Sequence, residues 1–141
     1  MTARRVEDVQ IERVADEILV VKEGSLEAHA LNQSAATVYD LCDGNTSKSE
    51  MAAEIHRRTG LPADEEIVDL ALSELVETGL VMLDDPESRS AGTRRALIRR
   101  LALSSTLALM LPVVETVVVP AEGQVLLISP IRTPSPTPTG L

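Results

Sequence analysis

Short apolar runs bounded by charged and turn-forming residues dominate the first thirty positions. Val6, Val9 and Ile11 alternate loosely with polar residues, and residues 18–21 are apolar and mostly β-branched. A Gly-Ser turn at 24–25 separates this run from another stretch of alternating residues. The pattern predicts three short antiparallel strands, at about 6–12, 17–22 and 26–31.

The apolar positions then change to a helical spacing. Between residues 35 and 42 they recur at i, i+3, i+4 and i+7, which is one face of a helix that either Asn32 or Ser34 can cap. Ser47 to Glu50 forms a capping-box pattern that opens a second helix. Asp64 can cap a third helix, whose apolar residues Val68, Ala71, Leu72 and Leu75 point inward.

A fourth short strand at 80–83 closes this unit. The order of three strands, three helices and a strand predicts an α+β domain of winged-helix type, with a three-stranded antiparallel sheet. The predicted organisation is a domain at 1–85, a linker at 86–96, an apolar extension at 97–129 with a helix and a β-hairpin (113–129), and a Pro-rich flexible tail at 130–141.

Composition and charge narrow the classes of function. Tyr39 is the only aromatic residue, which excludes an aromatic stacking platform for single-stranded nucleic acid. Residues 1–85 contain 7 basic and 19 acidic residues, a net charge of −12, whereas residues 86–141 contain 6 and 3, a net charge of +3. An acidic front half is a poor surface for a phosphate backbone and suits a basic peptide or protein.

Candidate catalytic and metal-ligating residues are sparse. His29 and His56 lie apart from each other and from Cys42, so their spacing offers no zinc site, and both are read as solvated or half-buried. Cys42 lies on the apolar face of the first helix with no base beside it, which predicts a buried, unreactive side chain. The acidic pairs at 65–66 and 84–85 read as helix-start and turn residues. We therefore predict no enzymatic activity, no metal and no cofactor.

One stretch, from Ile18 to Leu83, carries a family resemblance. Its core runs from His29 to Gly44 and contains, in order, Leu-Asn, Ala-Ala, an aromatic residue and Asp-Gly. Thr46 to Ile55 and then Val68 to Leu80, which ends in Gly-Leu, complete the pattern. This stretch resembles the PqqD family, the pyrroloquinoline quinone (PQQ) biosynthesis protein D family. The fold of that family also serves as the recognition element for ribosomally made, post-translationally modified peptides (RiPPs).

The resemblance implies a non-catalytic peptide chaperone. The single cysteine and the charged start of the sequence favour a cytoplasmic location. Such a chaperone binds the leader of a precursor peptide by strand addition, between its third strand and third helix, and presents it to a modifying enzyme such as a radical enzyme. Exposed strand edges and neighbouring helix pockets suit that mode of binding. The acidic third helix would favour leaders that carry Lys or Arg. The implied peptide-binding residues are Glu27, Ala28, His29, Ala30, Leu31, Ile67, Leu70 and Glu74, with Ile67 and Leu70 toward the flank of the helix.

Two alternatives stay open. The first is a winged-helix nucleic-acid-binding protein in which Arg57 and Arg58 contact phosphate, although the charge of the domain opposes it. The second is a membrane-associated adaptor that uses residues 94–119, where four arginines precede an apolar run. The charge-free part, 101–114, is shorter than the roughly 20 residues of a bilayer span and contains Pro112. We therefore favour packing on the domain or on a partner over membrane-surface contact, and either over a span.

Overall fold

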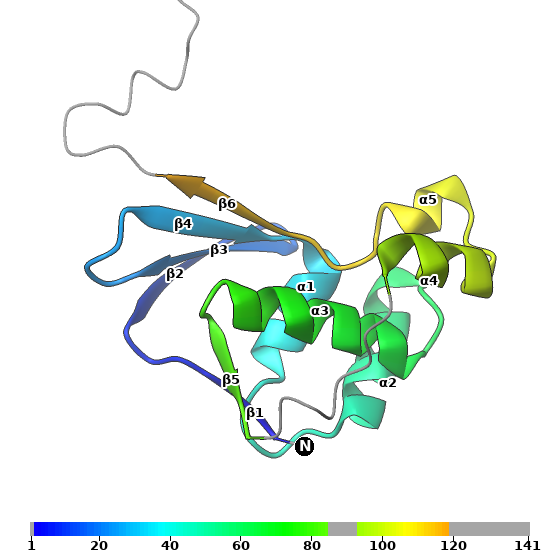
Figure 1. The fold of residues 1–141 in the computed structure, drawn as a ribbon, viewed down its shortest axis with the longest axis horizontal. Helices are drawn as coiled ribbons and strands as arrows, with labels where there is room; N and C mark the ends of the chain where they lie inside the picture. The colour runs from blue at the N-terminus through cyan, green and yellow to red at the C-terminus, as the bar shows by residue number, and fades with distance from the viewer. Residues whose placement is uncertain (1, 85–92, 119–141) are drawn as a thin grey trace, which may run out of the picture.

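This computed structural model describes residues 2–84 and 93–118, which form antiparallel strands packed against helices (Figure 1). The strands are β1 (Ala3–Arg5), β2 (Val9–Val14), β3 (Glu17–Lys22), β4 (Glu27–Leu31), β5 (Val81–Leu83) and β6 (Val114–Val118). The helices are α1 (Gln33–Asp40), α2 (Lys48–Thr59), α3 (Glu65–Glu77), α4 (Arg94–Leu101) and α5 (Ser105–Ala108). The predicted α+β class is confirmed.

The strands form two separate antiparallel sheets. One is a four-stranded sheet in the order β2-β3-β4-β6, and the other is a ribbon in which β1 pairs with β5. The prediction of one three-stranded sheet is therefore wrong. Its first strand, predicted at 6–12, begins only at Val9 as β2, because β1 ends before it at Arg5, and a strand from the extension joins the far edge of the sheet. The likeness to a winged helix stays a prediction.

The helix starts follow the capping residues of the sequence. Asn32, and not Ser34, caps α1 by accepting a hydrogen bond from the backbone of Ala35. Ser47 and Glu50 form the expected capping box on α2. Gly60 ends that helix in the left-handed region, with φ 85°, where a side chain would be strained. Local chemistry therefore fixes where the helices begin and end.

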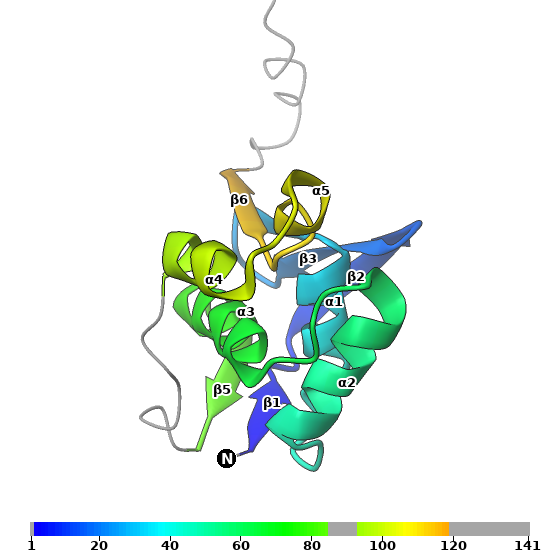
Figure 2. The ribbon, with the colours of Figure 1, turned by 90° about the vertical axis from the view of Figure 1, so that its right-hand side faces the viewer.

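The core lies between the four-stranded sheet and helices α1 to α3 (Figures 1 and 2). Ile18 and Val20 point into it from β3, and Leu31 points into it from β4. The predicted inward residues of α3 are all buried, as are Tyr39 and Cys42 of the first helical face. Because Tyr39 is the only aromatic residue, aliphatic side chains provide nearly all of this packing.

Residues 94–118 pack onto this domain. Leu97 of α4 and Leu111 belong to the same buried cluster as the helices, and α4 lies against α3. Helix α4 begins at Arg94, inside the predicted linker, because Thr93 caps it. Among the described residues, no helix is long and apolar enough to cross a membrane. The second run of the predicted hairpin and the Pro-rich tail lie outside the described residues.

Two leucines two positions apart test how far the extension contributes to stability. Leu111 is 0% exposed, whereas Leu109 is 79% exposed. We expect Leu111→Ala to lower the free energy of unfolding by about 2–5 kcal/mol, the usual cost of a core cavity. Leu109→Ala should change it by less than about 0.5 kcal/mol. Urea denaturation of the full chain measures both values, and equal small effects would contradict the packing of Leu111 in the core.

Candidate functional site

The outer edge of β4 is covered by the chain's own residues. Strand β6 pairs with it antiparallel over five positions, from Glu27 opposite Val118 to Leu31 opposite Val114 (Figure 1). We use the name β4–α3 groove for the outer edge of β4 together with Glu74 of α3, where residues 110–118 lie. The expectation of an open edge at 27–31 is therefore wrong, because this edge already has a strand paired to it.

Asn32 holds the beginning of the filling segment. Its side-chain amide donates a hydrogen bond to the carbonyl of Leu111 (2.9 Å), and its side-chain oxygen accepts one from the N–H of Val113 (3.0 Å). Its backbone N–H donates to the carbonyl of Val113 (3.2 Å). Ser34 adds a hydrogen bond from its hydroxyl to the carbonyl of Met110. These contacts bind main-chain atoms, so they hold an extended backbone whatever side chains it carries.

Glu74 of α3 holds the same segment from the other side. One carboxylate oxygen accepts a hydrogen bond from the N–H of Val114 (2.8 Å). The other accepts from the guanidinium of Arg94 in α4 (2.9 Å), and Arg94 also donates to the carbonyl of Pro112. Glu74 therefore already has a cationic partner, which removes the reason to expect a preference for basic leader peptides at this position.

His29 faces the segment from the middle of β4. It is only 1% exposed, and its Nδ1 lies 2.9 Å from the hydroxyl of Thr116, its direct partner in the strand register. The expectation of a solvated or half-buried His29 is thus wrong. Burial lowers the pKa of His29 below its ordinary value of 6.5, Glu27 partly offsets this, and Lys22 adds to it. The imidazole is therefore held in its neutral form.

The other residues implied by the resemblance divide between groove and core. Ala28 and Ala30 lie on β4 opposite Val117 and Glu115. Ile67 is 0% exposed in the core, so its predicted place on the flank of α3 is wrong, and Leu70 is half-buried against the core. The peptide-binding residues implied by the resemblance did not include Asn32, Ser34 or Arg94. Asn32 was visible in the sequence only as a helix cap, and no local pattern shows its second role.

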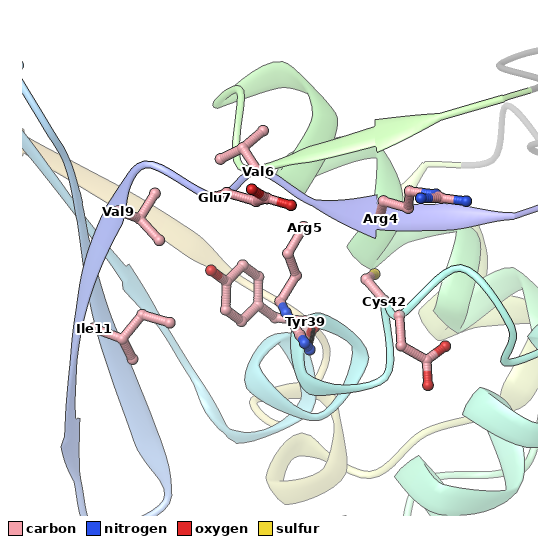
Figure 3. A pocket seen from close by; sticks show the side chains of 9 residues that line it. Arg4, Arg5, Val6, Glu7, Val9, Ile11, Tyr39 and Cys42 are labelled. Carbon is pink, nitrogen blue, oxygen red and sulfur yellow. Dashed lines mark hydrogen bonds between the residues drawn. The ribbon is translucent and has the colours of Figure 1, made fainter.

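A separate cavity of about 430 Å³ lies between the start of the chain and α1 (Figure 3). Its lining includes Arg4, Val9, Ile11, Tyr39 and Cys42. Burial raises the pKa of the Cys42 thiol to about 12, so it is not a thiolate nucleophile at neutral pH. Nor do the residues described bring together three or more His, Cys, Asp or Glu side chains that could hold a metal. This cavity offers no catalytic arrangement.

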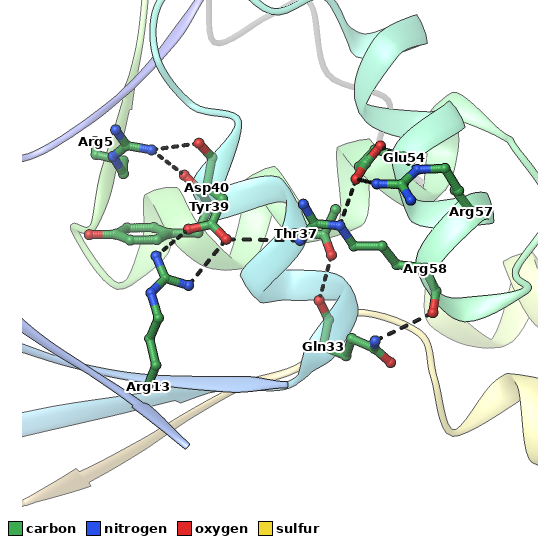
Figure 4. A network of polar contacts seen from close by, with 9 residues as sticks. All are labelled: Arg5, Arg13, Gln33, Thr37, Tyr39, Asp40, Glu54, Arg57 and Arg58. Atoms are coloured by element: carbon green, nitrogen blue, oxygen red, sulfur yellow. Dashed lines mark hydrogen bonds and ion pairs between the residues drawn. The ribbon is translucent and has the colours of Figure 1, made fainter. Parts of the chain in front are cut away.

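The arginines on which the nucleic-acid alternative depends are engaged with carboxylates (Figure 4). Arg57 and Arg58 both pair with Glu54 on the same helix, and Arg58 also lies 4.0 Å from Asp40. Asp40 in turn binds Arg13 of β2 at 2.8 Å. These contacts tie α2, α1 and the sheet together, and they do not favour a phosphate-binding role for the pair.

The burial of His29 predicts a pH dependence of stability. Because the folded-state pKa lies below the unfolded value of 6.5, the unfolded chain takes up a proton first as the pH falls. The contribution of neutral His29 to stability is therefore fully present above about pH 6.5 and is lost as the pH falls toward the folded-state pKa. We expect a lower free energy of unfolding at pH 5.5 than at 7.5, measured with urea.

The matched control is His29→Gln, which keeps a hydrogen-bonding side chain without a group that titrates in this range. The difference between pH 7.5 and 5.5 should shrink in this variant. An equal pH dependence in both chains would show that His29 is not the responsible group.

Comparison with known protein families finds a match in the part of the chain that contains β4 and α3. The family model described as "Coenzyme PQQ synthesis protein D (PqqD)" matches residues 17–81, which run from the start of β3 to the start of β5. No curated protein and no solved structure matches the chain. The matched stretch contains β4 and α3 but not the segment that fills the space between them. Over residues 17–81, this chain is therefore similar to the PqqD family.

Proposed function

We propose that this chain is a non-catalytic partner of a peptide-modifying enzyme in PQQ or other RiPP biosynthesis. In this proposal the β4–α3 groove takes the leader of a precursor peptide as an added strand and presents it to the enzyme, which can be a radical enzyme. The match of residues 17–81 to the PqqD family model supports the association with such a pathway. The proposed contact residues on β4 are Glu27 to Leu31, with Glu74 on α3.

The observation that carries the proposal is the way residues 110–118 occupy the groove. Residues 114–118 form a strand antiparallel to β4, and residues 110–113 before it are bound largely through main-chain atoms. This is the geometry of strand addition, in which backbone hydrogen bonds provide affinity and alternate side chains provide specificity. A leader of similar shape could use the same donors and acceptors.

The direction of the backbone groups identifies the donors. The N–H of Asn32, which has an extended backbone, donates to Val113. Because N–H groups alternate sides along a strand, those of Ala30 and Ala28 also point toward β6. On β6, the N–H of Val114 points to Glu74, so those of Glu115 and Val117 point to β4.

A leader from another chain must compete with β6, which we call the resident strand because it already pairs with β4. A covalently attached segment has an effective concentration on the order of millimolar, so a free peptide at lower concentration gains little access. Weakening the resident strand should therefore reveal the binding capacity of the groove. Glu115 is suited to this purpose because its side chain is exposed while its N–H faces β4.

The test uses the full chain carrying Glu115→Pro, which removes that N–H, with Glu115→Ala as the matched control. The probe is a fluorescein-labelled peptide of residues 109–118, followed by fluorescence anisotropy. We expect it to bind the proline variant at least about 10-fold more tightly than the wild type or the alanine variant, since losing one ladder hydrogen bond and its geometry costs about 1.4 kcal/mol or more.

Binding should also shift the backbone amide resonances of Ala28 and Ala30. A folded Glu115→Pro chain that binds the peptide no better than wild type would refute the proposal. So would a bound state in which no amide between 27 and 31 changes.

A further inference from the structure

Only some side chains of residues 111–118 face the protein, and they differ in what they meet. Leu111 is 0% exposed and lies within the main buried cluster. Its carbonyl accepts the hydrogen bond from the Asn32 amide, so it lies where the segment meets the start of α1. A strand with a polar residue at this position would place an unpaired polar group among aliphatic side chains.

Val114 is the second inward position. It is half-buried, packs against the core and lies directly opposite Leu31 of β4. This is the type of strand pair in which the two residues do not exchange hydrogen bonds, so their side chains lie close together. Its N–H donates a hydrogen bond to Glu74. Proline has no N–H and cannot make this bond, whereas every other residue can.

Thr116 is the third position that meets the domain. The residue as a whole is exposed, but its hydroxyl contacts a polar group on β4. Its hydroxyl is the hydrogen-bond partner of the buried Nδ1 of His29. A hydroxyl can donate to or accept from either tautomer of a neutral imidazole. An apolar residue here would leave a buried nitrogen without a partner, which is costly.

The intervening positions point the other way. Glu115 is exposed, and Val117 is 50% exposed, on the face of the strand that lies away from the core. Neither side chain has a described hydrogen-bond partner, and both residues contribute only their backbone to the ladder. They should therefore accept any residue except proline.

We infer that the β4–α3 groove selects segments of the pattern apolar-apolar-x-apolar-x-hydroxyl, whose last three residues pair antiparallel to β4, with Leu111, Pro112, Val114 and Thr116 as the template. The inference rests on the proposed function, because it names the class of leader peptide that the same groove takes. A matching leader has Leu or a similar residue first with an apolar residue directly after it, an aliphatic residue three positions after the first, and Ser or Thr two positions after that.

The first arm of the test changes the resident strand in the full chain. Amide hydrogen exchange of Ala30, whose N–H faces β6, reports how often the strand opens. Thr116→Val should speed this exchange about 10-fold, whereas Thr116→Ser should change it less than about 3-fold, since a hydroxyl is kept. Val117→Thr is the matched control at an outward position and should leave exchange unchanged.

The second arm places the same changes in the peptide. Peptides of residues 109–118 are titrated onto the Glu115→Pro chain. The peptide with Thr116→Val should bind about 10-fold more weakly than the unchanged peptide, and the one with Val117→Thr should bind equally well. If the unchanged peptide binds but Thr116→Val and Val117→Thr have the same effect, the pattern is wrong while the groove still binds peptides. If no peptide binds, the proposed function itself fails.

Discussion

The hydrogen bonds of Asn32 are the contact on which the arrangement around the groove depends. This one residue ends β4, caps α1 and binds the backbone of residues 111 and 113 on the incoming segment. The same side-chain oxygen serves both the helix cap and Val113, so the start of α1 and the register of β6 are set together. A shift of the segment by one residue would turn its inward side chains to solvent. Asn32 thereby links a local feature, the cap of α1, to the pairing of β4 with β6, whose residues are far apart in the sequence.

Much of the fold follows from local sequence patterns. The run at 17–22, the helix caps Ser47 and Asp64, and the inward face of α3 all lie where spacing and capping chemistry predict them. The first strand was predicted less well because five of the six residues of β2 are exposed, which leaves no clear alternation to read. The pairing of β4 with β6 joins positions more than eighty residues apart. No periodicity within either strand indicates such a partner, so the edge of β4 looked free.

The basic second half of the chain packs against the acidic first half through ion pairs between α4 and α3. Arginines of α4 meet acidic residues at both ends of α3, with Arg94 on Glu74 in its last turn and Arg100 on Asp64 and Glu66 at its start. Such partly exposed ion pairs contribute little stability each. The burial of Leu97 and Leu111, together with the β4–β6 ladder, provides the larger part, and the charges orient α4 as it packs.

The position of β6 in the chain has a consequence for the order of events during synthesis. Both walls of the groove are encoded before residue 78, whereas the strand that fills it ends at residue 118. At translation rates of roughly 5–20 residues per second, the nascent domain spends about 2–8 s with its walls made and its resident strand not yet synthesised. During this interval a partner strand meets no tethered competitor. Newly made chains and mature chains thus differ in how readily the groove can be entered, although their sequence and final fold are the same.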